Sequence, residues 1–541
     1  MMRKILLVIV IVSFILSVVN ANSAETDKFR YTVSLNPLTI PGLPGLHSFV
    51  CAQYNGKWLI IGGRRDGSHA RQPFRSFPGD ENNTDIYVID VNEKMFKRAS
   101  VNVLPVSLKE QLQSGNMNYY QDDKTLFITG GYAYSASEDD HITFPFLTSV
   151  YVPDLINAVL NGTPVNSCFR QIKDTIFAVT GGQMGKIGNY FYLIGGQKFD
   201  GRYNPMGHPT YKQTYADGFR KFKIMSSGSG LSFSDPEIIT DQVHLHRRDY
   251  NLLPQIFPDG SSGYTVSSGV FRANANLPFL YPVNISESGY EPVTSFNQYL
   301  CNYHTAKVFM YDKKNNQMHT IFFGGISQYY LNDNSELIND KSVPYVKTIS
   351  RLSGYADGSL HEFALPVEMQ SYTGSNGEFM PAHNISLYPS GIIVLNKIKG
   401  DSVLIGHIFG GIISTELNPF TRNNNESTSA ENLIYEVRLI KNNSIKNKEI
   451  DGSNPFTANV LKDAASGMMI AELNVPYDGS AELSISNNKG IIIFQRSFKK
   501  LFRGSQIVEL TDYKMLTESN YNFNFTFDNK FDFIKEMQIN K

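Results

Sequence analysis

The sequence predicts an all-β protein built from six similar sheets, with a smaller β domain at its C-terminal end. Five apolar strands end in a glycine pair, and each is followed by a loop and a further strand. Tyr and Phe supply most of the 12% aromatic residues, which suits the pleated surface of a sheet. One such sheet leaves its edges and faces uncovered, so it is stable only when it packs against further copies.

The repeat unit is clearest in residues 48–98. Strands at 48–54 and 58–61 are followed by a polar loop, a third strand at 85–91 and a fourth that begins near Met95. Glycine at a strand end reaches backbone angles closed to other residues and lets neighbouring backbones approach closely. The pairs are Gly62-Gly63, Gly130-Gly131, Gly195-Gly196, Gly324-Gly325 and Gly410-Gly411, and a sixth copy at 264–270 keeps one glycine.

This pattern resembles the kelch repeat, and the resemblance covers about residues 31–441. Kelch repeats are blades of β-propellers, about 50 residues each, set around a central channel. The resemblance implies a six-bladed kelch-type β-propeller over residues 29–441, with long loops after the glycine pairs. The family usually has a tryptophan late in each repeat. The one tryptophan here, Trp58, precedes a glycine pair, so Phe96 and other aromatic residues are expected at the late position.

Residues 1–21 are predicted to be a secretory signal peptide rather than part of the fold. Arg3-Lys4 form a basic start, residues 5–19 are an apolar run, and Val19-Asn20-Ala21 has the small-x-small pattern of a cleavage site. The run is shorter than the roughly 20 residues of a membrane-spanning helix, which argues against an uncleaved anchor. No other stretch is long enough to span a membrane, so no integral span is expected after cleavage.

Residues 29–36 alternate in polarity and are predicted to form a strand. The sixth repeat is short of one strand, because the chain becomes rich in Lys and Asn after residue 440. A first strand that pairs with the last repeat would close the ring and remove two exposed edges. We therefore expect residues 29–36 to be the outer strand of the sixth sheet. In the second repeat, residues 155–160 are predicted to form a short helix.

The composition changes after residue 441. Residues 442–453 are predicted to be a linker, because Lys, Asn, Ser and Gly dominate them. Residues 454–541 are predicted to form a small Ig-like β-sandwich, because short strands alternate with turn residues. The expected strands are 468–475, 481–486, 491–498, 506–510, 521–527 and 533–539.

The blocks 481–490, 519–525 and 534–541 resemble a type IX secretion (Por) sorting domain. Such domains lie at the C-terminus of exported proteins of certain Gram-negative bacteria, where the outer-membrane secretion machinery recognises them. The usual Gly-x-Tyr is Ser519-Asn520-Tyr521 here, and Asn tolerates the left-handed backbone of a turn. The resemblance implies a protein secreted or anchored at the outer cell surface, with the type IX machinery as a partner. The alternative is an ordinary Ig-like accessory domain.

Charge and cysteine content exclude two classes of protein. The net charge of −1 and the lack of Lys/Arg-rich runs give no electrostatic basis for binding nucleic acid. Three cysteines, an odd number in an exported chain, argue against a disulfide framework. Cys51 lies in an alternating strand and is predicted to be a buried free thiol, whereas Cys168 and Cys301 are either two thiols or one bridge.

The predicted binding site is one mouth of the channel. If the strand before each glycine-pair strand lines the channel, its first residues face the same mouth. These positions are polar in all six repeats, and polar groups that converge on a concave place indicate a ligand site. The predicted ligand-binding residues are His47, Asn118, Gln183, Arg248, Asp249, Asn251, Tyr303, His304 and His383.

The sequence favours a binding module for a glycan or protein ligand over an enzyme, and it predicts no cofactor and no metal. No Ser-His-Asp order, phosphate loop or metal-spaced Cys/His cluster occurs in it. One enzyme hypothesis uses His47, His304 and His383 as ligands of a transition metal.

Two further enzyme hypotheses come from other kelch propellers. Copper-radical oxidases need a Tyr-His pair, a distant histidine and a cysteine cross-linked to a tyrosine, and Tyr303-His304, His383 and Cys51 imitate that set. Sialic-acid epimerases bind an anionic sugar. In that case Arg247 or Arg248 would clamp a carboxylate, and His304 or Glu378 would move a proton.

Overall fold

The structure, a computed structural model, describes residues 27–71, 75–204, 210–227, 230–273, 275–421, 426–442, 447–462, 467–517 and 520–538. It confirms an all-β chain, in which the α-helices of the described ranges are short: α2 (Val106–Leu112) and α3 (Val152–Asn161). Helix α3 contains the helix predicted at 155–160 and begins three residues earlier. The signal peptide predicted for residues 1–21 lies outside the described residues. Within those residues, no helix has the length and apolar character needed to cross a membrane.

Residues 31–441, here called the main body, form six antiparallel sheets, each with four principal strands. The first three sheets are β2 (Val50–Tyr54), β3 (Lys57–Ile61), β4 (Asp85–Asp90) and β5 (Met95–Ser100); β6 (Gly115–Asp122), β7 (Thr125–Ser135), β9 (Phe146–Tyr151) and β10 (Phe169–Lys173); and β11 (Gln183–Ile187), β12 (Tyr190–Ile194), β15 (Gly218–Ser227) and β16 (Gly230–Thr240). The last three are β17 (Asn251–Ile256), β18 (Ser262–Ser267), β19 (Val283–Ser286) and β20 (Gly289–Pro292); β21 (Lys307–Asp312), β22 (Gln317–Phe323), β25 (Thr348–Gly354) and β26 (Leu360–Glu368); and β28 (Glu378–Pro381), β30 (Ser402–Phe409), β33 (Ile434–Lys441) and β1 (Tyr31–Leu38).

Shorter strands extend these sheets or form small sheets of their own. They are β8 (Asp140–Thr143), β13 (Gln197–Asp200) and β14 (Lys212–Tyr215) on the second sheet, β29 (Ile393–Val394) and β34 (Lys448–Ile450) on the fifth, the pair β23 (Tyr329–Leu331) and β24 (Leu337–Asn339), and the trio β27 (Tyr372–Ser375), β31 (Ile412–Ser414) and β32 (Thr428–Ala430). Strand β34 lies within 442–453 and pairs with β26. The segment predicted to be a linker is therefore partly a strand of the fifth sheet.

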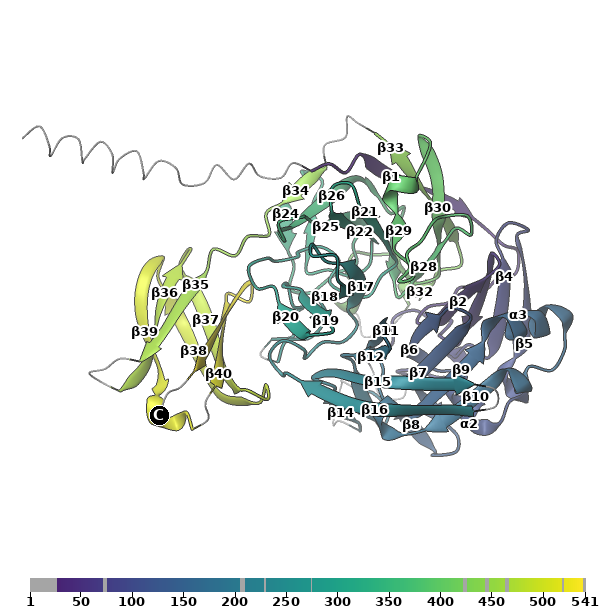
Figure 1. The fold of residues 1–541 in the computed structure, drawn as a ribbon, viewed down its shortest axis with the longest axis horizontal. Coiled ribbons are helices and arrows are strands. Elements are labelled where there is room, and N and C mark those ends of the chain that lie inside the picture. The colour runs from purple at the N-terminus through teal and green to yellow at the C-terminus, as the bar shows by residue number, and fades with distance from the viewer. Residues whose placement is uncertain are drawn as a thin grey trace, which may run out of the picture.

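A closed ring of backbone hydrogen bonds joins the six sheets at the start of their first strands. Six residues, one from each sheet, each donate an N–H to the carbonyl oxygen of the next, with N···O distances of 2.7–3.3 Å. The order is Ser48 to Asn376, Asn376 to His304, His304 to Asp249, Asp249 to Gly181, Gly181 to Asn116 and Asn116 to Ser48. Figure 1 shows the sheets around a common centre, with β2, β6, β11, β17 and β28 on the inside. The six first strands, hereafter the inner strands, therefore surround one axis.

The N-terminal strand closes this arrangement, as predicted. Strand β1 pairs antiparallel with β33, in a register that runs from Tyr31 opposite Lys441 to Leu38 opposite Ile434. Val33 on β1 is 1% exposed and belongs to a core shared by the fifth and sixth sheets. The first strand of the chain is thus the outer strand of the last sheet.

Residues 454–541, here called the C-terminal domain, form two further sheets to one side of the main body (Figure 1). One contains β35 (Thr457–Lys462), β36 (Met468–Val475) and β39 (Gly504–Asp512), and the other β38 (Ile492–Leu501), β37 (Gly479–Asn487), β40 (Asn520–Phe527) and β41 (Phe531–Gln538). All six predicted strands are present, β36 with the predicted bounds and the others with shifted ends, and β35 was missed. The two sheets enclose a core made only of residues of this domain, so it does not depend on the main body for its core.

The three cysteines are free thiols. Cys301 is buried and its Sγ donates to the carbonyl oxygen of Gly324 at 2.8 Å, so the alternative of a bridge to Cys168 is wrong. Cys51 is half-buried rather than fully buried.

Candidate functional site

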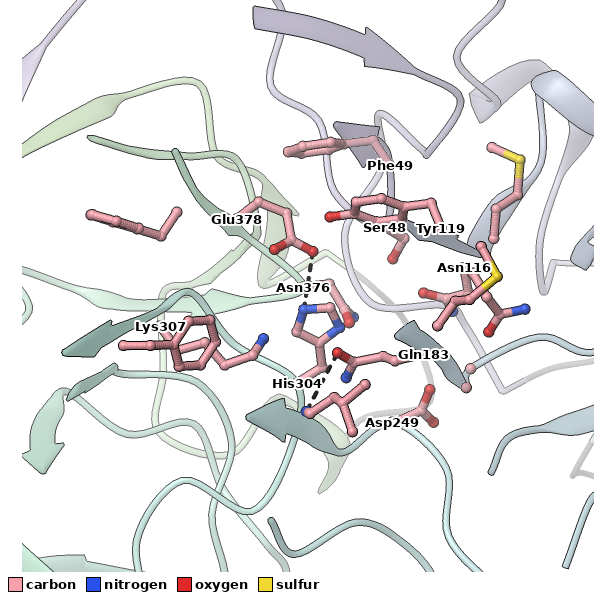
Figure 2. A pocket seen from close by; sticks show the side chains of 18 residues that line it. Ser48, Phe49, Asn116, Tyr119, Gln183, Asp249, His304, Lys307, Asn376 and Glu378 are labelled. Carbon is pink, nitrogen blue, oxygen red and sulfur yellow. Dashed lines mark hydrogen bonds and ion pairs between the residues drawn. The ribbon is translucent and has the colours of Figure 1, made fainter. Parts of the chain in front are cut away.

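A pocket of about 180 Å³ lies where the six inner strands begin. Every one of the six ring residues lines it, and five of them carry polar side chains while the sixth is Gly181. Figure 2 shows the labelled side chains turned toward this space from all sides. Further lining residues are Phe49, Asn118, Tyr119, Gln183, Lys307, Phe309, Glu378 and Phe379. The pocket thus combines polar groups from all six sheets with four aromatic rings.

Backbone geometry explains why small polar residues occupy the ring. Ser48, Asn116, Gly181, Asp249 and Asn376 all have positive φ, between 50° and 66°. Asn, Asp and Gly tolerate this left-handed conformation better than most residues. Their N–H and carbonyl groups are engaged around the ring, so their side chains remain to line the pocket.

A histidine and a glutamate lie side by side in the pocket, His304 and Glu378. Nε2 of His304 lies 3.1 Å from Oε1 of Glu378, and the two side chains are 20% and 15% exposed. Burial raises the pKa of the Glu378 carboxyl, but the charge and hydrogen bond of His304 and the charge of Lys307 outweigh it. The pKa of this carboxyl is therefore below its ordinary value, and it is ionised at neutral pH. A carboxylate beside an imidazole can hold a proton between them.

Lys307, the first residue of β21, adds a cation to the pocket. Its side chain is buried, and Nζ donates to the carbonyl oxygen of Thr305 at 3.1 Å. Burial lowers the pKa of the Lys307 ammonium, and the charge of Glu378 partly offsets this effect. The site therefore holds both signs of charge within one small space.

Tyr119 and Cys51 lie next to each other on β6 and β2. The Sγ of Cys51 is 3.2 Å from the hydroxyl oxygen of Tyr119. Burial raises the pKa of both groups, and the charge of Glu378 raises both further. The thiol is therefore protonated at neutral pH and is not an activated nucleophile.

Four predicted ligand-binding residues line the pocket: Asn118, Gln183, Asp249 and His304. Asn118 is also tied to the fold, because its Nδ2 donates to the carbonyl oxygen of Val179 at 2.9 Å. The amide of Gln183 donates to the carbonyl oxygen of Tyr250. Asp249 and His304 supply the charged groups of this set.

Four more predicted residues lie beside the pocket and serve the fold. His47 is 5% exposed, with Nε2 3.6 Å from Asp66, and burial lowers the pKa of its imidazole. Arg248 pairs with Asp249 and lies over the ring of Phe271. Asn251 is fully buried, and its Nδ2 donates to the carbonyl oxygen of Tyr303 at 2.7 Å. The structure thus engages these residues with neighbouring loop residues, Asp66, Asp249, Phe271 and Tyr303.

The prediction that His383 lies at the mouth is wrong. Strand β28 begins at Glu378, five residues earlier than expected, so His383 lies in the turn beyond the other end of this strand. It is exposed and faces Gly56, in the turn between β2 and β3. Gly377, which precedes a short apolar strand, was the sequence signal that β28 begins at residue 378.

The position of His383 also removes two metal hypotheses. The three histidines His47, His304 and His383 do not share a site, and no group of three His, Cys, Asp or Glu side chains in the described ranges is arranged to hold a metal ion. The ligand order proposed by analogy with copper-radical oxidases needs the same histidine. Neither set of ligands is therefore assembled.

The arginine proposed as a carboxylate clamp is also engaged elsewhere. Arg247 is 1% exposed and donates to the carbonyl oxygens of His244, Ser268 and Tyr281 at 2.7–2.8 Å. Neither it nor Arg248 lines the pocket.

Sequence reasoning missed five polar residues of the pocket and its aromatic lining; the polar ones are Ser48, Asn116, Tyr119, Lys307 and Asn376. A usable signal existed for the ring. In four sheets, a residue that tolerates positive φ stands two positions before the inner strand, as Ser48 does before Val50. Lys307 and Tyr119 had no such signal, because both lie in the inner strands and not at the ring positions.

Comparisons with known proteins were made for the whole chain. No protein-family model matches it, and no curated protein matches it. Among solved structures, one titled "Structure of YjhT" is similar over 76% of this chain and 99% of that chain, with a TM-score of 0.42 and 11% sequence identity. The function is therefore argued from the site itself.

Proposed function

We propose that the six sheets are the blades of a kelch-type β-propeller, and that the pocket at its mouth binds a glycan. The observation that carries this proposal is the convergence on one pocket of polar side chains that lie at or just before the start of all six inner strands. Amide, carboxylate and ammonium groups hydrogen-bond hydroxyls, and the rings of Phe49, Tyr119, Phe309 and Phe379 offer apolar surface to the C–H face of a sugar.

The size of the pocket favours one sugar unit over a folded protein surface. Its volume of about 180 Å³ is below the roughly 300–1,000 Å³ of drug-sized ligand sites. A terminal sugar of a glycan can enter such a space, whereas a protein partner would have to insert a single side chain. A glycan-binding propeller is therefore the function that the geometry supports best.

A matched pair of histidine variants tests this proposal on a glycan array. His304→Ala removes a hydrogen-bonding group that lies beside the Glu378 carboxylate and is expected to weaken glycan binding by roughly ten- to a hundredfold. His361→Ala removes a histidine that also pairs with a glutamate, Glu449 at 2.6 Å, but outside the pocket. This control should bind like the unchanged protein. Equal affinity of the two variants for every glycan that binds would move the site away from the mouth.

The His304–Glu378 pair supports a second candidate function, an enzyme that moves a proton on a bound sugar, as sialic-acid epimerases do. An imidazole nitrogen 3.1 Å from a carboxylate oxygen in a pocket can act with it as acid and base. In this case Glu378→Gln should abolish conversion of the sugar while the sugar still binds. If the NMR spectra of a bound sugar stay unchanged over hours with the intact protein, the enzyme hypothesis is wrong and only the binding function remains.

We also infer that residues 1–21 direct export and that the C-terminal domain is a type IX sorting domain, which places the protein outside the cell or on its outer surface. The separate core of this domain supports a removable unit. Deleting residues 454–541 is expected to leave a folded main body in the periplasm, as fractionation and circular dichroism would show. Recovery of the shortened protein from the culture medium would contradict the sorting role.

A further inference from the structure

A larger cavity lies between the main body and the C-terminal domain. Its volume is about 420 Å³, within the roughly 300–1,000 Å³ range of small-molecule sites. Gln242 and Arg272 line it from the main body, and Gln495, Ser497, Asn524 and Asp532 line it from the C-terminal domain. Hydrogen bonds beside it hold the two parts together, from Nδ2 of Asn297 to the carbonyl oxygen of Lys530 at 2.8 Å and from the N–H of Gln242 to that of Gly490 at 3.2 Å.

Buried polar groups from both parts lack hydrogen-bond partners at this cavity. Arg272 is 5% exposed, and only its Nε is satisfied, by the carbonyl oxygen of Pro278 at 2.9 Å. Its Nη1 lies 3.6 Å from Oδ2 of Asp532, a charge contact that is too long for a hydrogen bond, and neither that oxygen nor Oδ1 of Asn524 has a hydrogen-bond partner. Each unpaired buried group costs about 1–3 kcal/mol, so this arrangement favours a polar occupant.

The charges around the cavity indicate a neutral occupant. Arg272 and Arg496 are balanced by Glu482 and Asp532. An anion would meet the two carboxylates, and a cation would meet the two guanidinium groups. The remaining polar lining consists of amides and hydroxyls, which pair well with groups that both donate and accept.

We propose that this cavity binds a neutral polyhydroxylated molecule, a sugar or polyol, which bridges the main body and the C-terminal domain. One hydroxyl oxygen accepts from the guanidinium of Arg272, and a neighbouring hydroxyl donates to Asp532 or Asn524. The two unsatisfied sides of the interface are thereby joined through the ligand. Because the ligand contacts both parts, its binding stabilises the docked position of the C-terminal domain.

Hydrogen exchange on the full chain tests this proposal with cellobiose, trehalose and inositol as neutral probes and with galacturonate and glucosamine as charged ones. At least one neutral probe should slow amide exchange in β40 and β41 in a saturable way, and more strongly than either charged probe. Asn524→Ala should lower the affinity for that probe, measured from the saturable protection, at least tenfold. Asn522→Ala is the matched control, because Asn522 lies two residues away on the same face of β40 and does not line the cavity. The affinity of this variant for the probe should stay within twofold of that of the unchanged protein.

The variant Arg272→Met tests the cavity from the main-body side. It should lower the affinity for the same probe at least tenfold. The variant His304→Ala should leave the effect unchanged, because His304 belongs to the mouth pocket. The proposal is overturned if no neutral probe gives saturable protection, which would mean that the cavity holds water only. It is also overturned if Asn524→Ala and Asn522→Ala behave alike, or if a charged probe binds best.

Discussion

Replacing Gly130 with alanine is expected to prevent the main body from folding. Gly130 has a φ of +67°, and a Cβ atom there would lie 1.7 Å from the carbonyl oxygen of Val179. The carbonyl group of Val179 belongs to the backbone and cannot move aside as the end of a flexible side chain can. The second and third sheets would therefore have to separate at the glycine pair. A soluble protein without a cooperative melting transition, or no soluble protein at all, is the expected outcome in a thermal denaturation experiment.

Gly162→Ala is the control for this change. Gly162 has nearly the same φ, +65°, but an added Cβ would meet nothing within 4 Å. Only the left-handed conformation is then penalised, by about 1–2 kcal/mol, which lowers the melting temperature by a few degrees. Similar melting temperatures for the two variants would show that close approach of the backbones is not what requires glycine at position 130.

Deleting residues 27–38 is expected to be nearly as damaging, because three stabilising features are lost together. Strand β1 leaves β33 without its eight-residue partner. Phe29 and Val33, both buried, leave the core, at about 1.5–3 kcal/mol each. Arg351, whose side chain is fully buried, loses its partner Asp27 at 2.5 Å, and an unpaired buried charge costs about 3–5 kcal/mol. The sum approaches the whole stability of a typical domain.

Differential scanning calorimetry would check this loss, with a chain that begins at residue 27 as the reference. Asp27→Asn removes the charge of the Asp27–Arg351 ion pair and leaves strand β1 in place. This variant should still fold, with a melting temperature lowered by several degrees. If the deletion variant melted within a degree or two of the reference, β1 would not be the strand that stabilises the sixth sheet.

The fold could be predicted from local patterns because its signals lie within each repeat. Apolar strands such as Trp58–Ile61 ran into glycine pairs, and alternation located β1 and its partner β33 although some 400 residues separate them. Strand β35 was missed, since Thr457–Lys462 follows a proline and has a weak apolar pattern. The pairing of β34 with β26 depends on where the chain leaves the main body, and no local pattern encodes that position.

The site was predicted only in part, because side-chain direction depends on where each inner strand begins. Asn118, Gln183, Asp249 and His304 line the pocket. For Asn118, Gln183 and His304 a glycine-pair strand follows soon after and fixes the register, and for Asp249 a strand that keeps one glycine does so. His383 was misplaced because β28 has only four residues and a long loop before β30. Lys307 was overlooked, since a lysine at a strand start is ordinarily solvated, whereas here it is buried in a pocket that residues distant in the sequence form.

The pairing of β1 with β33 has a consequence for the time at which the protein folds. At a synthesis rate of about 5–20 residues per second, β1 waits roughly 20–80 s before residues 434–441 are made. Throughout that interval the nascent chain carries an unpaired strand edge that is open to chaperones. The sixth sheet therefore cannot be completed until residue 441 of 541 has been made, so the main body reaches its final fold only late in synthesis.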